Sequence, residues 1–208
     1  AALDLLGPDY TWNTEFRTDG EVDEGVLRGN LYVRGGGDPK LVLERLQEAF
    51  IRLQDAGVRV ILGDMVLDQS AFELPPHDPG AFDGEALRPY NAAPEALLVN
   101  FKSVVLHFTP DLRHRVAHVR SEPPMEGLTI DGTVPLARMA CGDWRGALRA
   151  RFDDPNRIRF EGQFPQGCGE REWPVAYQDP DSYAARAMEG MWRATGGSLT
   201  GQVRQGLT

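Results

Sequence analysis

The sequence predicts an α+β fold in which short, mostly antiparallel strands combine with two to three helices. Short segments that alternate apolar and polar residues recur along the chain between turn residues. Two longer segments instead place apolar residues at helical spacing. The chain has 208 residues, of which 41% are hydrophobic and 25% are charged, so we expect one domain or two small ones.

The first third of the chain predicts a hairpin, a helix and a strand. Residues 10–35 alternate apolar and polar residues on both sides of an acidic turn, which is typical of a β-hairpin. Asp38 can cap the following helix, Pro39 suits its first position, and Gly57 can end it. The apolar face of this helix consists of Leu43, Leu46, Phe50 and Leu53. Residues 58–68 then predict one strand.

The rest of the chain predicts several short strands and a second helix. Residues 72–94 are rich in proline and glycine, and so long a connection is usually functional or covers something. Residues 96–110 predict a strand pair, and further short strands follow between residues 115 and 167. The second helix spans residues 179–197, with Asp179 or Asp181 as its cap and Gly196 at its end.

Three consecutive glycines, Gly35 to Gly37, stand where a phosphate-binding loop would lie, between a strand and a helix. A Walker loop requires Lys followed by Ser or Thr directly after its last glycine, and no such pair follows these glycines. A dinucleotide loop requires a third glycine at the position that Lys40 occupies. We therefore interpret the glycines as a tight strand-to-helix turn that needs positive φ angles.

Composition and motifs exclude several functions. The net charge is −9 and no basic cluster occurs, so we expect no nucleic-acid partner. No apolar stretch approaches 18 residues, so we expect no transmembrane segment. His114 and His118 have the spacing of a zinc-protease motif, but Arg115 follows the first histidine and the surroundings favour a strand. We expect neither a metal nor another cofactor.

No local motif for a nucleophilic enzyme is present either. The five serines lie in none of the patterns G-x-S-x-G, S-x-x-K or S-x-N, and K-T-G is absent. The two cysteines, Cys141 and Cys168, leave open a disulfide or two buried thiols. Both ends of the sequence also look cut, because Ala1–Leu6 is under two turns of helix and the last residues read as an unfinished strand. We expect a piece of a longer protein.

Five segments, taken together and in order, resemble the class C low-molecular-mass penicillin-binding proteins, which are serine D-Ala-D-Ala carboxypeptidases and endopeptidases. The segments are AALDLLGPDYTWNTEF, LRGNLYVRGGGDPKL, AGVRVILGDMVLDQSAF, YNAAPEALLVNFKSVVLHFTP and CGEREWPVAYQDPDSYAARAM. In that family the catalytic domain carries a large insertion between S-x-x-K and S-x-N, and this chain resembles the insertion with short flanks. The resemblance implies that the catalytic residues lie outside this chain, which alone would be inactive.

The resemblance also implies a division of the chain. Residues 1–10 would end a catalytic-domain helix, and residues 11–90 would form the hairpin-helix-strand region. Residues 91–178 would form one or more β-rich inserted domains, and residues 179–208 would return toward the catalytic domain.

Two site residues follow from the resemblance alone. By position, Glu85 and Tyr90 match an acidic and an aromatic residue that contact the diaminopimelate end of the peptidoglycan stem peptide in relatives. Asp83 competes for the acidic role, because the loop can shift by one or two residues. The family is exported to the periplasm, and that oxidising location implies a disulfide between Cys141 and Cys168.

The parent protein is therefore expected to hydrolyse peptidoglycan stem peptides through an acyl-serine intermediate. Its partners would be those peptides and β-lactams, both bound through the missing catalytic domain. Two alternatives are a non-catalytic module that binds or assembles the cell wall, and an unrelated α+β domain.

Overall fold

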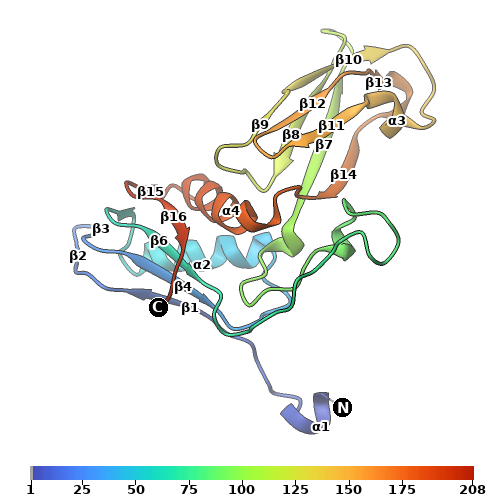
Figure 1. Ribbon diagram of the computed structural model, residues 1–208. Helices are drawn as coiled ribbons and strands as arrows, with labels where there is room; N and C mark the ends of the chain where they lie inside the picture. The colour runs from blue at the N-terminus through green and yellow to red at the C-terminus, as the bar shows by residue number, and fades with distance from the viewer. Residues whose placement is uncertain (1) are drawn as a thin grey trace. The chain divides into compact units, whose positions relative to one another are not determined.

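The computed structural model describes residues 2–208, with side chains from Asp4 onward, and forms two compact units (Figure 1). Unit 1 contains the chain up to Pro76, Pro94–Val99 and Thr195–Thr208. Unit 2 contains His77–Ala93 and Asn100–Ala194. The long proline- and glycine-rich connection of residues 72–94 is thus shared, and most of it, His77–Ala93, belongs to unit 2.

Unit 1 contains two four-stranded sheets and two α-helices. The first sheet has the order β1 (Thr14–Thr18), β4 (Leu31–Gly35), β6 (Met65–Asp68), β16 (Val203–Gln205). The second has the order β15 (Ser198–Leu199), β5 (Val60–Ile61), β3 (Val26–Leu27), β2 (Val22–Asp23). The helices are α1 (Ala2–Leu6) and α2 (Leu43–Asp55).

Helix α2 joins β4 to the strands that follow it, and its apolar face packs on the first sheet. Leu46 and Phe50 are fully buried, and the Phe50 ring lies edge-on to Phe16 of β1 with the ring centroids 6.2 Å apart. Since a helix connects them, β4 and β6 pair in parallel. Gly57, with a φ of 103°, follows the helix in the left-handed conformation predicted for its end.

The predicted start of α2 was wrong. Asp38 accepts the N–H of Lys40 at 2.9 Å and closes a local turn, so its carboxylate is not used as the helix cap. The helix begins five residues later at Leu43, and Val42 occupies the cap position without a side-chain hydrogen bond.

The three glycines are required for two different reasons. Gly37 has a φ of 85°, as a turn glycine should. Gly35 and Gly36 lack a positive φ and are needed for space. A Cβ on Gly35 would lie 2.2 Å from the Ala96 carbonyl oxygen, and one on Gly36 would lie 2.5 Å from that of Asn13. The prediction of positive φ angles therefore holds for one glycine of the three.

Unit 2 contains a five-stranded sheet, a three-stranded sheet and helices α3 (Trp144–Leu148) and α4 (Pro180–Ala194). The larger sheet has the order β13 (Phe164–Pro165), β10 (Thr133–Ala137), β8 (Val116–Glu122), β7 (Ser103–Asp111), β14 (Arg171–Ala176). The smaller has the order β11 (Ala150–Asp154), β12 (Arg157–Phe160), β9 (Thr129–Ile130). Three short 3-10 turns are η1 (Pro89–Asn91), η2 (Asn100–Lys102) and η3 (Gln166–Cys168).

Aromatic side chains fill the interior of unit 2. Phe108 of β7 stacks on Phe164 with centroids 5.5 Å apart and meets Phe160 of the smaller sheet edge-on. Tyr183 of α4 is fully buried, and its hydroxyl donates to the Ser103 carbonyl at 2.7 Å. Burial raises the pKa of that hydroxyl. These contacts join both sheets and α4 within one unit.

The predicted mixture of helices and strands is confirmed, whereas the mostly antiparallel pairing holds only in part. In unit 2, β7 pairs antiparallel with both β8 and β14. In unit 1, β6 pairs in parallel with both β4 and β16. Residues 58–68 form two strands in different sheets because the chain bends at Gly63, where a Cβ would meet Asn30 and Gly29.

The predicted strand pair over residues 96–110 was also wrong. Only β7 is formed there, because Asn100, Phe101 and Lys102 all have φ angles between 42° and 54°. Such angles take the chain out of the extended conformation and turn it into the start of β7.

Candidate substrate-binding loop

The loop of residues 77–93 lies wholly in unit 2 and carries both site residues that the resemblance implies. It is fixed to the sheet by a backbone hydrogen bond in which Ala176 of β14 donates to the Leu87 carbonyl at 2.9 Å. Its end is the single turn η1, whose last residue, Asn91, is buried. A proline- and glycine-rich segment without long regular structure is therefore still tied to the fold at several points.

Asp83 is the centre of the hydrogen bonds in this loop. Its carboxylate accepts the Tyr90 hydroxyl at 2.7 Å, the Asn91 side-chain amide at 2.8 Å and the Glu85 N–H at 2.9 Å. These hydrogen bonds hold the pKa of Asp83 below its usual range, and the one from Tyr90 has the largest effect. In return, the Asp83 carboxylate raises the pKa of Tyr90.

Glu85 and Tyr90 both point a large part of their side chains to solvent. The Glu85 side chain is 60% exposed, and its carboxylate lies 3.5 Å from the Arg88 guanidinium. Tyr90 is 66% exposed. The loop therefore carries both an accessible carboxylate and an accessible aromatic ring, and groups of these two kinds can bind an ammonium group on an aliphatic chain.

Asn91 and His77 are two residues of this loop that the sequence did not single out. The Asn91 amide also donates to the Glu85 carbonyl at 3.1 Å, and the His77 Nε2 lies 2.8 Å from the Asn91 carbonyl oxygen. A lone asparagine or histidine in a polar loop gives no sequence signal, because its importance depends on burial and partners that only the fold supplies.

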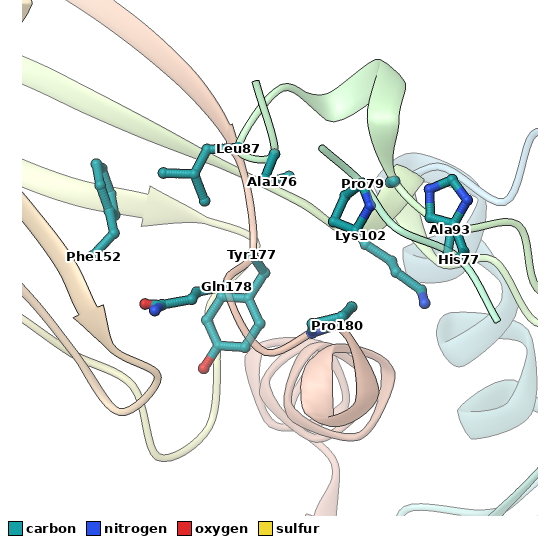
Figure 2. Close-up of a pocket in the computed structure, with 12 residues that line it drawn as sticks. His77, Pro79, Leu87, Ala93, Lys102, Phe152, Ala176, Tyr177, Gln178 and Pro180 are labelled. Carbon is teal, nitrogen blue, oxygen red and sulfur yellow. The ribbon is translucent and has the colours of Figure 1, made fainter. Parts of the chain in front are cut away.

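A cavity of about 330 Å³ lies under the same loop (Figure 2). Leu87 and Ala93 line it from the loop, and Phe152, Tyr177 and Pro180 line it from the rest of unit 2. Its wall is largely apolar, and Gln178 adds an amide.

The two histidines with zinc-protease spacing meet at one carboxylate. His114 Nδ1 lies 2.6 Å, and His118 Nε2 lies 3.5 Å, from the Asp111 carboxylate. His118 belongs to β8, whereas His114 lies in the turn before it, so the expectation that both occupy one strand was wrong. Within residues 2–208, no group of three or more His, Cys, Asp or Glu side chains is placed to hold a metal ion.

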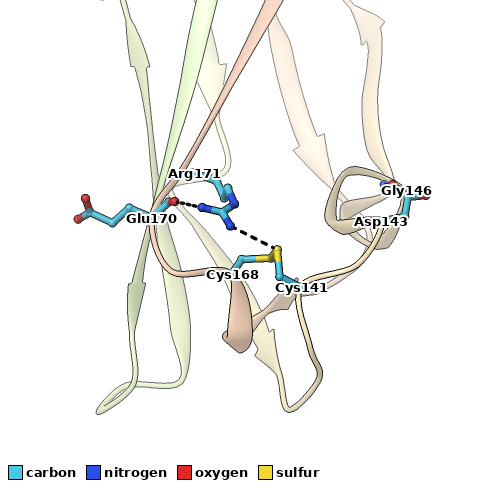
Figure 3. The surroundings of a disulfide bond; sticks show 6 residues. All are labelled: Cys141, Asp143, Gly146, Cys168, Glu170 and Arg171. Carbon is cyan, nitrogen blue, oxygen red and sulfur yellow. Dashed lines mark hydrogen bonds between the residues drawn. A yellow bond between two sulfur atoms is a disulfide. The ribbon is translucent and has the colours of Figure 1, made fainter.

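Cys141 and Cys168 are bonded to each other in unit 2 (Figure 3). The bond joins the segment after β10 to η3, across 27 residues of sequence. Arg171 of β14 lies beside it, with one guanidinium nitrogen 3.8 Å from the Cys141 sulfur and another bonded to the Glu170 carbonyl at 3.0 Å. Arg171 thus links the disulfide to β14 of the larger sheet. Both cysteines are far in sequence from the loop that carries Glu85.

Comparison with known proteins identifies the family. The D-Ala-D-Ala carboxypeptidase 3 (S13) family model matches residues 1–208. The chain belongs to this family. The resemblance to the class C penicillin-binding proteins, drawn from five short segments, is therefore confirmed.

Two curated D-alanyl-D-alanine carboxypeptidases match nearly all or part of the chain. The chain is 25% identical over 207 residues to the D-alanyl-D-alanine carboxypeptidase DacB of Haemophilus influenzae, covering 98% of this chain and 42% of the relative. It is 33% identical over 73 residues to a D-alanyl-D-alanine carboxypeptidase of an Actinomadura species, covering 35% of this chain and 14% of that protein.

Two solved structures share the fold. The crystal structure of penicillin binding protein 4 (dacB) from Haemophilus influenzae matches with a TM-score of 0.69 and 21% identity, over 100% of this chain and 46% of that one. A complex of the same protein with a novel β-lactam matches with a TM-score of 0.57 and 22% identity, over 100% and 42%. The chain thus spans less than half the length of these relatives.

Over the described residues 2–208, the helices are too short or too polar for any of them to pass through a lipid bilayer.

Proposed function

We propose that this chain is the accessory region of a periplasmic serine-type D-Ala-D-Ala carboxypeptidase/endopeptidase. The match of the family model to all 208 residues supports this proposal, as does the order of the five resembling segments. The catalytic patterns S-x-x-K, S-x-N and K-T-G do not occur in the sequence, so the nucleophile and its base would lie in another part of the parent protein. The Cys141–Cys168 disulfide suits an oxidising compartment such as the periplasm.

In this proposal the parent acts on peptidoglycan stem peptides by acyl transfer. The serine hydroxyl attacks the carbonyl between the two terminal D-Ala residues, and its proton passes by way of a base to the leaving amine. Water then hydrolyses the acyl-serine ester and regenerates the hydroxyl. A β-lactam would acylate the same serine, and the resulting ester would be hydrolysed slowly. β-Lactams would therefore be covalent ligands of the parent.

The residues of this chain would recognise the substrate away from the scissile bond. The observation that carries this proposal is the pairing of an exposed carboxylate, Glu85, with an exposed ring, Tyr90, on one fixed loop. The Glu85 carboxylate would bind the ammonium of the diaminopimelate side chain, and the Tyr90 ring would pack on its methylenes. Binding energy from such remote contacts holds the reacting carbonyl in place.

Labelling with a fluorescent penicillin tests the enzyme proposal. We expect no covalent label on the 208-residue chain and a strong label on the full-length parent, because only the parent would contain the reactive serine. An unlabelled parent would rule the proposal out. Binding of peptidoglycan fragments by such an inert parent would instead support the alternative, a non-catalytic cell-wall module.

Substitutions in the full-length parent test the two site residues. Glu85→Gln and Tyr90→Ala should each lower kcat/KM by about tenfold for peptides with a free diaminopimelate ammonium, since each removes one remote contact. Peptides that end in D-Ala-D-Ala but lack that ammonium should react almost as before with Glu85→Gln. Equal losses on both kinds of peptide would remove Glu85 from the site.

A further inference from the structure

We propose that Asp83 and Asn91 are positioning residues that hold Glu85 and Tyr90 in place for the substrate, and that Asp83 does not itself bind the substrate ammonium. We call this pair the Asp83–Asn91 latch. The inference rests on the proposed function, because it assigns roles within the same binding loop. It also decides which of two nearby acids, Asp83 or Glu85, meets the ligand.

The hydrogen bonds of the two acids differ in number and strength. Asp83 accepts three hydrogen bonds of 2.9 Å or less, all from the loop itself. A carboxylate has about four acceptor positions, so little capacity is left for a ligand. Glu85 has one exposed ion pair, at 3.5 Å, with Arg88. Exposed ion pairs of this kind are weak and readily exchanged, so an incoming ammonium can replace Arg88 at Glu85.

Asn91 fixes the loop from its buried side. The residue is 6% exposed, and its amide donates to the Asp83 carboxylate and to the Glu85 carbonyl. Its own carbonyl contacts His77 at 2.8 Å, at the beginning of the loop. The side chain of this buried residue therefore connects Asp83 to Glu85, and its backbone carbonyl adds the contact with His77. Leaving the partners of the side chain unsatisfied would be costly.

Tyr90 depends on the latch because it has little packing of its own. A tyrosine ring that is 66% exposed can adopt several rotamers in the absence of other restraints. The 2.7 Å hydrogen bond from its hydroxyl to Asp83 selects one of them before a ligand arrives. Restraint of this kind lowers the entropy cost of binding, so its loss is expected to appear in substrate affinity.

Kinetics of the full-length parent with two matched peptides test this role. Both peptides end in D-Ala-D-Ala, and they differ only in whether the side-chain amine of the third residue is free or acetylated. Asp83→Ala and Asn91→Ala should raise KM for the free-amine peptide by about tenfold, with kcat changed less than twofold. The acetylated peptide and the rate of acylation by penicillin should be unaffected, which a general loss of folding would not allow.

Two further variants separate positioning from direct binding. In Asp83→Asn the side-chain oxygen can still accept the Glu85 N–H and the Asn91 amide, and the new NH2 can donate to the Tyr90 oxygen. This variant should therefore recover most of the affinity that Asp83→Ala loses. Adding Tyr90→Phe to Asp83→Ala should cause little further loss of affinity, because both changes remove the same hydrogen bond, the one between Tyr90 and Asp83. Arg88→Ala is the matched control, because the Arg88 side chain pairs with Glu85 and only its backbone, which the change keeps, contacts Asn91. This variant should not raise KM for the free-amine peptide.

The results that would overturn the latch are specific. Wild-type kinetics for Asp83→Ala, or equal losses on both peptides, would show that Asp83 has no positioning role. A loss in Asp83→Asn as large as in Asp83→Ala, with an additive loss from Tyr90→Phe, would show that the Asp83 charge binds the ammonium directly.

A titration of the 208-residue chain tests the latch apart from catalysis. The ultraviolet absorption of tyrosinate, with Tyr90→Phe to assign the signal, should show that Asp83→Ala lowers the pKa of Tyr90. An unchanged pKa would overturn the latch. If the full-length parent is not labelled by penicillin, the proposed function fails and the role in substrate binding fails with it, while this titration still decides whether the latch exists.

Discussion

Asp68, the last residue of β6, is a buried carboxylate that is 2% exposed. It accepts the Ser70 N–H at 2.9 Å, and the Thr208 N–H and hydroxyl at 2.8 Å and 2.6 Å. Burial alone would raise the pKa of Asp68, but the hydrogen bonds from Ser70 and Thr208 outweigh burial and hold the pKa well below its usual range. The ionised carboxylate therefore fastens the last residue of the chain to the first sheet of unit 1.

This geometry predicts how stability depends on pH. Because the folded pKa of Asp68 is depressed, its contribution is complete above the unfolded pKa of about 3.9 and is lost as the pH falls toward the folded value. Asp68→Asn should lower the free energy of unfolding by about 1–3 kcal/mol at pH 7. The new amide nitrogen cannot accept a hydrogen bond, and it would face a donor of Ser70 or Thr208. Urea denaturation should show this difference shrinking below pH 4. A difference that stays constant down to pH 3 would contradict the prediction.

At the scale of residues, the sequence located the site only in part. The resemblance placed Glu85 and Tyr90 on one loop, and whether they contact substrate stays a prediction. Neither spacing nor composition could assign the hydrogen bonds of Asp83 or the burial of Asn91, because both depend on how η1 folds back on the loop. The glycines of residues 35–37 show the same limit, since the backbone that crowds Gly35 belongs to Ala96.

The helix α2 lacks a side-chain cap at its first turn. Val42 has the extended conformation of a cap residue, with φ −79° and ψ 170°, but its side chain cannot accept the free N–H groups. Val42→Thr keeps the shape and adds a hydroxyl, so it should stabilise the protein by about 1 kcal/mol. Thermal or urea unfolding measures the gain. Val42→Ala is the control and should give no gain; equal stability of the Thr variant and wild type would refute a missing cap.

At the scale of elements, periodicity was a good guide to helices and a poor guide to strand boundaries. Both α2 and α4 were expected because their apolar faces repeat at helical spacing over more than ten residues. The turn η2 was not, because Phe101 and Lys102 have little intrinsic preference for a positive φ. Contacts with residues remote in sequence stabilise that turn. One of them is a hydrogen bond of 2.9 Å from the Tyr177 N–H to the Lys102 carbonyl.

At the scale of the whole molecule, the disulfide should contribute to the stability of unit 2 and not to that of unit 1. Cys141 and Cys168 close 27 residues of unit 2, so replacing both by Ser should lower the stability of that unit by about 3–4 kcal/mol on the chain-entropy estimate. Hydrogen exchange should show faster exchange in β7, β8 and β14 and unchanged exchange in β4 and β6. Equal acceleration in both units would mean that they unfold together.

The division of the chain into units shows why topology was hard to predict. Residues 94–99 and 195–208 return to unit 1 after excursions into unit 2. The parallel partners β6 and β16 are separated by more than a hundred residues, and no local pattern reports such a pairing. The four-part division expected from the family resemblance, with boundaries after residues 10, 90 and 178, stays a prediction.

The late return of the chain to unit 1 affects the order of events on the ribosome. The strands of unit 2 have all been synthesised once Ala176 is made, whereas β5 and β6 wait for β15 and β16 at residues 198–205. Until then both strands have an open edge that can pair with another nascent chain. The part of unit 1 that is translated first is therefore completed only when residues 198–205 have been made, and its dependence on chaperones should last until then.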